Sequence, residues 1–200
     1  MSELILASGS PYRRELLTRL RLAFTVVSPD VDERAEGAED GADLAWRLAL
    51  LKANAVAARH PDAIVIGSDQ VAECAGSLLG KPGTVERAIE QLTFCSGREV
   101  VFHTAVAVVG KGREQVRLVP TRVRMRQLVP DTIEQYIRDD QPLDCAGAMK
   151  SEALGIALTE AITSDDPTAL VGLPLIAVAD MLRAAGLPVP GSLPQAQPAQ

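Results

Sequence analysis

The residues with the clearest chemical potential stand near the start of the chain, in the segment SGSPYRR at residues 8–14. Ser10 can cap a helix that begins at the following proline. A helix N-terminus presents unpaired N–H groups and the positive end of its dipole, and both attract anions. Ser8 adds a hydroxyl, and Arg13 and Arg14 add permanently charged guanidinium groups. The segment predicts a phosphate-binding corner, although an ordinary capped helix with solvated arginines has the same pattern.

A carboxylate follows a short apolar run, AIVIG at residues 63–67, in the order Ser68-Asp69-Gln70. The run is typical of a strand covered on both faces. Ligands of open α/β sheets bind beyond the carboxyl ends of their strands. Asp69 placed there could bind a divalent cation or accept a proton from an attacking water. An aspartate that caps a turn is the alternative interpretation.

Further charged residues are candidates for the same site. Lys81 stands on a tight turn between Gly80 and Pro82, and Lys52 follows an apolar residue of a predicted helix. Glu33 comes just after a predicted strand and could be a second carboxylate directed at a metal. Taken singly, each is also typical of a solvated surface charge.

The segment CAGAMKSE at residues 145–152 combines small residues with a carboxylate. Small residues allow the backbone to approach a ligand closely. Glu152 could then accept two hydrogen bonds from a guanine base, from N1 and the exocyclic N2. His60 and His103 have no serine or cysteine partner at a suitable spacing, so we do not expect a catalytic triad. Trp46 is expected in the core or an interface, and P-loop and dinucleotide-binding motifs are missing from the sequence.

The elements that must position these residues are indicated by hydrophobic periodicity and turn residues. The patterns predict an α/β fold with a mixed sheet, because two long strands joined by a tight turn fit poorly into a purely parallel sheet. A Pro- and Gln-rich tail from residue 188 to 200 is expected to be disordered, after a single domain over residues 1–187. The expected strands are residues 4–7, 63–67, 99–109, 113–125 and most of 153–162, and the expected helices begin at Pro11 and cover 43–59, 84–95, 130–138 and 172–185.

Composition limits the classes of function. Hydrophobic residues make up 47% of the 200 residues, which is enough for a sizeable core. The formal charge of −6 argues against general affinity for nucleic acid. The apolar runs are too short to cross a membrane, and the N-terminus lacks the pattern of a signal peptide. The three cysteines show no metal-binding or disulfide spacing, so a cytoplasmic protein is expected.

Several of these segments together resemble one family, the Maf nucleotide pyrophosphatases, in the same order and at similar separations. The resemblance extends from residue 4 to about residue 187. The matching segments are LASGSPYRRELL (6–17), the Asp32-Glu33 pair, Lys52, GSDQV (67–71), GKP (80–82) and CAGAMKSE (145–152).

The resemblance implies an elongated, twisted α/β sheet with helices on its faces and a cleft between two lobes, in a protein that is commonly a homodimer. It implies hydrolysis of a nucleoside triphosphate between the α and β phosphorus atoms with a divalent cation, Mg²⁺ or Mn²⁺. Asp69 matches the proposed general base, and Glu33 matches a carboxylate that binds metal or orients water, with Asp69 as its partner. The positions that match substrate-contacting polar residues are Ser8, Ser10, Arg13, Arg14, Lys52 and Lys81.

Tyr12, Gln70 and Glu152 are the positions that indicate the base. They look like the branch of the family that acts on N7-methyl-GTP, whereas the branch for dTTP and UTP typically has Arg, Thr and Gln there. A methylated guanine carries positive charge on its ring, which favours a carboxylate and an aromatic neighbour. Ala105 and the pair Ala148-Met149 depart from the family pattern, the second near the expected base pocket. A pyrimidine or broad-specificity pyrophosphatase, or a nucleotide-binding regulator of cell division, remains the alternative.

Overall fold

The computed structural model describes residues 3–37 and 39–190. A mixed sheet, with strand order β2-β1-β3-β5-β6-β7 and β4 on β3, forms its centre. The strands are β1 (Leu4–Ala7), β2 (Thr25–Val27), β3 (Ile64–Cys74), β4 (Ser77–Leu79), β5 (Glu99–Gly110), β6 (Arg113–Met125) and β7 (Thr159–Ser164). The helices are α1 (Pro11–Thr18), α2 (Gly41–Ala57), α3 (Val85–Cys95), α4 (Pro130–Asp140) and α5 (Leu175–Ala184), with 3-10 helices η1 (Ala146–Ala148), η2 (Leu154–Leu158) and η3 (Ala169–Val171).

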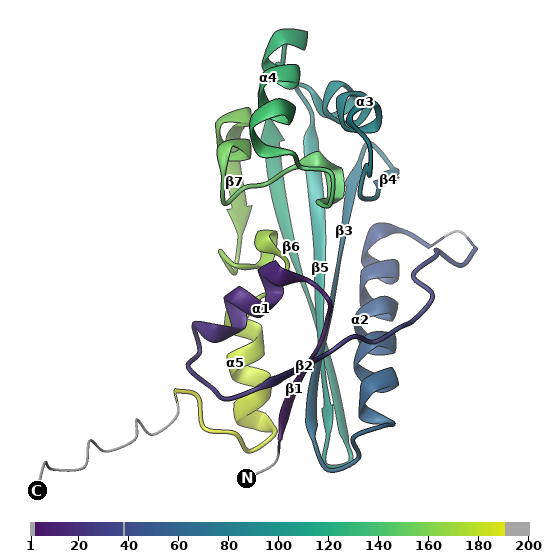
Figure 1. The fold of residues 1–200 in the computed structure, drawn as a ribbon, viewed down its shortest axis with the longest axis vertical. Coiled ribbons are helices and arrows are strands. Elements are labelled where there is room, and N and C mark those ends of the chain that lie inside the picture. The colour runs from purple at the N-terminus through teal and green to yellow at the C-terminus, as the bar shows by residue number, and fades with distance from the viewer. Residues whose placement is uncertain (1–2, 38, 191–200) are drawn as a thin grey trace, which may run out of the picture.

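The molecule is elongated because β3, β5 and β6 are long antiparallel strands that run through both of its halves (Figure 1). In one half, α1 and α5 cover one face of the sheet and α2 covers the other. In the other half, α3 and α4 pack beside β4 and the far ends of the long strands. β1 pairs in parallel with β2 and β3, so the sheet is mixed. The predicted fold class is confirmed.

Alternation along the strands divides the core of the first half between its two faces. Leu4 and Leu6 of β1 pack with residues of α1 and α5. Ile5 and Ala7 point the other way and pack with α2. The same alternation continues in β3, where Ile66 faces α1 and α5 and Val65 faces α2. The same alternation therefore decides which face of the sheet each later side chain of β3 points to.

A glycine lets α2 lie close to β3. A Cβ added at Gly67 would lie 2.3 Å from the carbonyl oxygen of Ala49 and 2.6 Å from the amide nitrogen of Ala53, which are closer than real contacts allow. Small residues on both elements thus bring the helix backbone against the strand. The next α2-facing residue of β3 after Gly67 is Asp69, which is therefore held next to the same turn of α2.

Two expected elements differ from the structure. The predicted strand at residues 63–67 is too short, because β3 continues to Cys74 by pairing with β5, with Asp69 opposite Ala105. Asp69 lies inside the strand, so the prediction that it follows the strand end is wrong. Residues 154–158 form a 3-10 helix instead of a strand, since a Cβ at Gly155 would lie 2.4 Å from the Lys150 carbonyl oxygen and the chain folds back there.

Further predictions from the sequence can be compared with the structure. The helix predicted at 43–59 begins at Gly41, since Asp40 caps it by accepting from the amides of the second and third following residues, both at 2.9 Å. Trp46 is 44% exposed and so is not a core residue. Val189, in the expected tail, is buried against the core of α1 and α5, and residues 191–200 lie outside the described part of the chain. Among the described residues, no helix is both long and apolar enough to span a bilayer.

Candidate active site

A cavity of about 810 Å³ opens where the edge of β3 is not paired. β1 pairs with β3 as far as Gly67, and β4 pairs with it from Ala72 onward. The residues between these two points carry their side chains alternately to the two faces of the sheet. Asp69 faces α2 and Gln70 faces the opposite side, and both line the cavity. The cavity is completed by residues 8–13 on one side and by residues 78–81 and 144–152 on the other.

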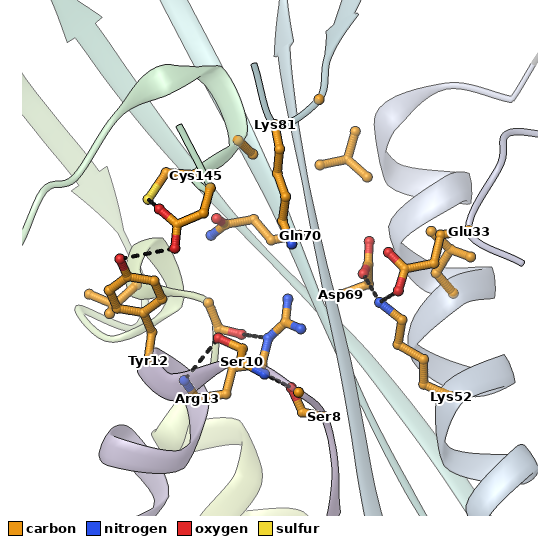
Figure 2. A pocket seen from close by; sticks show the side chains of 18 of the residues that line it. Ser8, Ser10, Tyr12, Arg13, Glu33, Lys52, Asp69, Gln70, Lys81 and Cys145 are labelled. Carbon is orange, nitrogen blue, oxygen red and sulfur yellow. Dashed lines mark hydrogen bonds and ion pairs between the residues drawn. The ribbon is translucent and has the colours of Figure 1, made fainter. Parts of the chain in front are cut away.

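Asp69 is paired with a buried lysine of α2. The Nζ atom of Lys52 lies 2.6 Å from Oδ1 of Asp69 and 2.8 Å from Oε1 of Glu33. Lys52 is 3% exposed and Asp69 is 6% exposed. Lys52 extends the stripe of α2 that begins with Leu44 and Leu48, four residues apart, and these also line the cavity. The structure brings together three predicted site residues, from the loop after β2, from α2 and from β3 (Figure 2).

The predicted phosphate-binding corner lies across the cavity from this lysine (Figure 2). Ser10 is the N-cap of α1, and its hydroxyl accepts from the backbone N–H of Arg13 at 3.4 Å. The hydroxyl of Ser8, which is almost fully buried, accepts from the backbone N–H of Ser10 at 3.1 Å. The Nε of Arg13 donates to the carbonyl oxygen of Gly172 at 2.8 Å. These contacts hold the hydroxyls and the guanidinium group at one end of the cavity.

Burial and charge act in opposite directions on Arg13. Burial lowers the pKa of its guanidinium group, and the negative charges of Asp69 and Glu33 raise it. An arginine remains charged in proteins even when it is shifted. Arg13 therefore places a partly desolvated positive charge near the two carboxylates, where it can bind a phosphate strongly.

Arg14 does not belong to this corner. It is exposed and is not among the residues that line the cavity, although it neighbours Arg13 in sequence. Successive helical residues point about 100° apart, so only one of two adjacent arginines can face the cavity. The phosphate-binding role expected for Arg14 is therefore not supported by its position. Lys81, by contrast, lines the cavity and extends into it from the opposite half (Figure 2).

A loop before α5, which was not among the predicted site segments, fixes the Gln70 side of the cavity. The Nε2 of Gln70 donates to the carbonyl oxygens of Ala169 at 3.0 Å and Leu170 at 2.9 Å, and to Oγ1 of Thr104 at 3.0 Å. The carbonyl oxygen of Gly172 accepts from Arg13 and also from the hydroxyl of Ser68 at 3.0 Å. The amide nitrogen of Gln70 is fully engaged, so its Oε1 is the atom left to contact a ligand.

The loop is itself held by a buried carboxylate. Asp166, 2% exposed, accepts at Oδ1 from the amide and hydroxyl of Thr168, at 3.0 and 2.7 Å. Its Oδ2 accepts from the amide of Ile176 in the first turn of α5 at 2.7 Å. The backbone carbonyls that hold Gln70 and Arg13 thus stand on a fixed loop. Backbone carbonyls carry no side-chain signal, but the sequence Asp-x-Thr before a helix is a capping pattern that could have indicated this loop.

The remaining wall comes from residues 144–152 and Tyr12. The Tyr12 hydroxyl donates to Oδ2 of Asp144 at 3.3 Å, and the Cys145 thiol donates to Oδ1 at 3.5 Å. Burial is the main cause that raises the pKa of the Tyr12 hydroxyl, and the neighbouring Cys145 and Asp144 raise it further. Burial likewise raises the pKa of the Cys145 thiol to about 12. Glu152 is exposed and lines the cavity on the same wall.

Asp69 and Glu33 are the carboxylates that could bind a divalent cation at the cavity. Both lie within 2.8 Å of the Lys52 ammonium nitrogen, which occupies the point on which they converge, so a divalent cation would contact their other carboxylate oxygens. Magnesium in phosphate-handling sites is usually held by one or two carboxylates together with substrate phosphates and water. Across residues 3–37 and 39–190, no cluster of three or more His, Cys, Asp or Glu side chains could hold a metal without such help. The two carboxylates fit a cation that completes its coordination with phosphate oxygens and water.

The family model for "Maf-like protein" matches residues 3–185 of the chain. The chain belongs to this family. A 7-methyl-GTP pyrophosphatase of Aromatoleum aromaticum is 58% identical over 191 residues, which cover 94% of this chain and 98% of that protein.

Another 7-methyl-GTP pyrophosphatase, from Xanthomonas axonopodis pv. citri, is 57% identical over 190 residues, which cover 95% of this chain and all of that protein. Among solved structures, the Ham1 protein of Staphylococcus aureus is 19% identical, with a TM-score of 0.47 over 63% of this chain and 73% of that chain.

Proposed function

We propose that this protein is a nucleotide pyrophosphatase that hydrolyses N7-methyl-GTP to N7-methyl-GMP and diphosphate. The observation that carries the proposal is that one cavity contains both the corner of Ser8, Ser10 and Arg13 and the carboxylate of Asp69. The first can bind phosphates, and the second can activate water. The names of relatives at 58% and 57% identity support the choice of reaction and nucleotide.

The phosphates would bind between the two halves of the molecule. The hydroxyls of Ser8 and Ser10 and the guanidinium group of Arg13 would bind them from one half. Lys81 would bind them from the other half. These groups are already oriented before substrate arrives, which is how fixed dipoles and charges stabilise charge in a transition state. Positioning and electrostatics are the main contributions of a protein to phosphoryl chemistry.

Asp69 would act as the general base. Its Oδ1 accepts the hydrogen bond from Lys52, and Oδ2 is left to accept a proton. Water oxygen would form a bond to the α phosphorus as the bond to the bridging oxygen breaks, and diphosphate would leave with the bonding electrons. The proton of the attacking water would go to Asp69. Asp69 and Glu33 would hold a divalent cation, Mg²⁺ or Mn²⁺, which when bound offsets negative charge on the phosphates.

The base would lie against the wall of Tyr12 and residues 144–152. Glu152 could accept from two N–H groups of guanine, and a carboxylate also favours the positive ring of N7-methylguanine. Oε1 of Gln70 is a further acceptor at the cavity. A homodimer and a cytoplasmic location complete the proposal, and both rest on the resemblance to the family and on cysteine usage.

A substrate panel tests this function. Diphosphate release would be measured with N7-methyl-GTP, GTP, dTTP, UTP and CTP at matched concentrations of enzyme and magnesium. We expect the highest kcat/KM with N7-methyl-GTP. Higher turnover of dTTP or UTP would show a pyrimidine pyrophosphatase, and tight binding without diphosphate release would show a nucleotide-binding regulator.

A pair of variants tests the base wall of the same proposal. Glu152→Gln should change the order of preference within the panel, because the charge and one good acceptor are lost. Glu160→Gln is the matched control, since Glu160 lies on β7 in an exposed pair with Arg124 and does not line the cavity. An unchanged order of preference in Glu152→Gln would remove this residue from base recognition.

A further inference from the structure

The cavity wall opposite Lys52 carries negative charge that the phosphate-binding residues do not explain. Asp144 and Glu152 line the cavity on this wall. The cation of the same segment, Lys150, directs its ammonium group away, to the carbonyl oxygens of Asp140 at 2.8 Å and Gln141 at 3.5 Å. The cations that line the cavity are Arg13, Lys52 and Lys81, and they belong to other segments. A triphosphate would be repelled by this wall, whereas a positively charged group would be attracted.

Asp144 contributes more than its charge, because it also accepts a hydrogen bond from Tyr12. Tyr12 is in the first turn of α1, and Asp144 lies in the loop between α4 and η1, in the other half of the molecule. Their hydrogen bond joins the two halves at the cavity (Figure 2). The second oxygen of Asp144 accepts from the Cys145 thiol, so the carboxylate is held from two sides. The raised pKa of Tyr12 keeps its hydroxyl protonated and available as the donor.

We propose that Asp144 is a specificity-determining residue, which orients the Tyr12 ring and places a negative charge beside the cationic ring of the methylated base. This inference rests on the proposed function and extends it. The aromatic face and the carboxylate act on the same feature of the ligand, its positive charge. A neutral guanine gains from the aromatic contact but lacks the charge attraction. Asp144 therefore separates N7-methyl-GTP from GTP, two substrates with the same phosphates.

Asp144→Asn tests the charge while it preserves the shape. The amide oxygen of asparagine can still accept from the Tyr12 hydroxyl. The ratio of kcat/KM for N7-methyl-GTP to that for GTP should fall by about three- to fivefold, the effect expected of one partly exposed charge near another. The ratio of inhibition constants of the two monophosphates, N7-methyl-GMP and GMP, should change by the same factor. This second readout does not depend on turnover.

Two other variants separate charge from ring position. Asp30→Asn removes a carboxylate that lines the same cavity on the loop carrying Glu33, and asparagine tolerates the positive φ of 46° found there. It should leave the ratio unchanged. Tyr12→Phe removes the hydroxyl but keeps the ring and the charge of Asp144. It should lower the ratio less than Asp144→Asn does.

The outcomes distinguish this inference from the function on which it rests. If the wild-type enzyme shows no preference for N7-methyl-GTP over GTP, the proposed function and the inference both fail. If the wild type has the preference and Asp144→Asn keeps it in both readouts, only the inference fails. An equal loss in Asp30→Asn would also overturn it, because the effect would then be the total charge of the cavity and not the position of Asp144.

Discussion

Replacing Lys52 with methionine removes the ammonium group that lies between two carboxylates and keeps most of the buried side-chain volume. Asp69, which is 6% exposed, would then be left buried without this partner. Breaking a buried ion pair by removing one member typically costs about 3–5 kcal/mol. The cost here should be about 2–3 kcal/mol, because the Glu33 side chain is 55% exposed and Arg13 still faces Asp69.

A double-mutant cycle with Asp69→Asn isolates the pair. The same Lys52→Met change should cost about 1–2 kcal/mol less in the Asp69→Asn background, because no buried carboxylate is then left unpaired. Urea unfolding followed by circular dichroism would give all four free energies. Lys111→Met, at the exposed turn between β5 and β6, is the control and should change stability by less than about 0.5 kcal/mol. A coupling energy below about 0.5 kcal/mol would refute the buried pair.

Further expectations follow from the same contacts. Arg13→Ala should lower kcat/KM about 100-fold for every nucleotide. Arg14 lies outside the cavity, so Arg14→Ala should change kcat/KM by less than about threefold. Similar losses in both variants would contradict the assignment of Arg13. Burial raises the pKa of Cys145 to about 12, so its alkylation rate should still increase above pH 10, and a plateau near pH 9 would contradict this. Hydrogen bonds from Arg47 lower the pKa of Glu39 to about 2, so Glu39 stabilises the fold above its unfolded pKa and this contribution is lost as pH falls toward 2. Glu39→Gln should therefore lower the melting temperature at pH 7, and the difference from wild type should close by about pH 2; a constant difference would argue against the pair.

Much of the fold could be predicted because local patterns agreed with the tertiary structure. The alternation in β1, the capping of α1 by Ser10 and the turn between β5 and β6 each carry a signal within a few residues. The length of β3 could not be predicted in this way. Its second half contains Ser68, Asp69 and Gln70, whose polar side chains do not match the pattern of a buried strand. One edge of β3 is unpaired at these residues, where the cavity lies.

The sequence predicts that a site exists more readily than it predicts which residues form the site. The phase of α1 relative to the sheet decides that Arg13 and not Arg14 reaches the cavity, and this phase depends on how α1 packs with α5. The burial of Lys52 depends on the close approach of α2 to Gly67, which involves residues far apart in sequence. The carbonyl groups that fix Gln70 belong to the backbone, so no pattern of side chains in the sequence indicates them.

The membership in the family and the mixed α/β fold are confirmed by the family model and by the sheet itself. The roles of individual side chains stay predictions. Ala105 and Met149 departed from the expected family pattern. Ala105 is fully buried opposite Asp69, and its carbonyl oxygen accepts from the Ser68 hydroxyl at 2.8 Å. Met149 lines the cavity, so the second departure affects the wall assigned to the base.

The most direct measurement is single-turnover release of diphosphate from N7-methyl-GTP by Asp69→Asn, beside its affinity for the nucleotide. Asparagine keeps the shape of the side chain and removes the proton acceptor. The rate should fall by at least about 100-fold, while binding measured without divalent cation, which then relies on the corner of α1 and on Lys81, stays within about threefold. Release at the wild-type rate would contradict the assignment of Asp69 as the group that activates water.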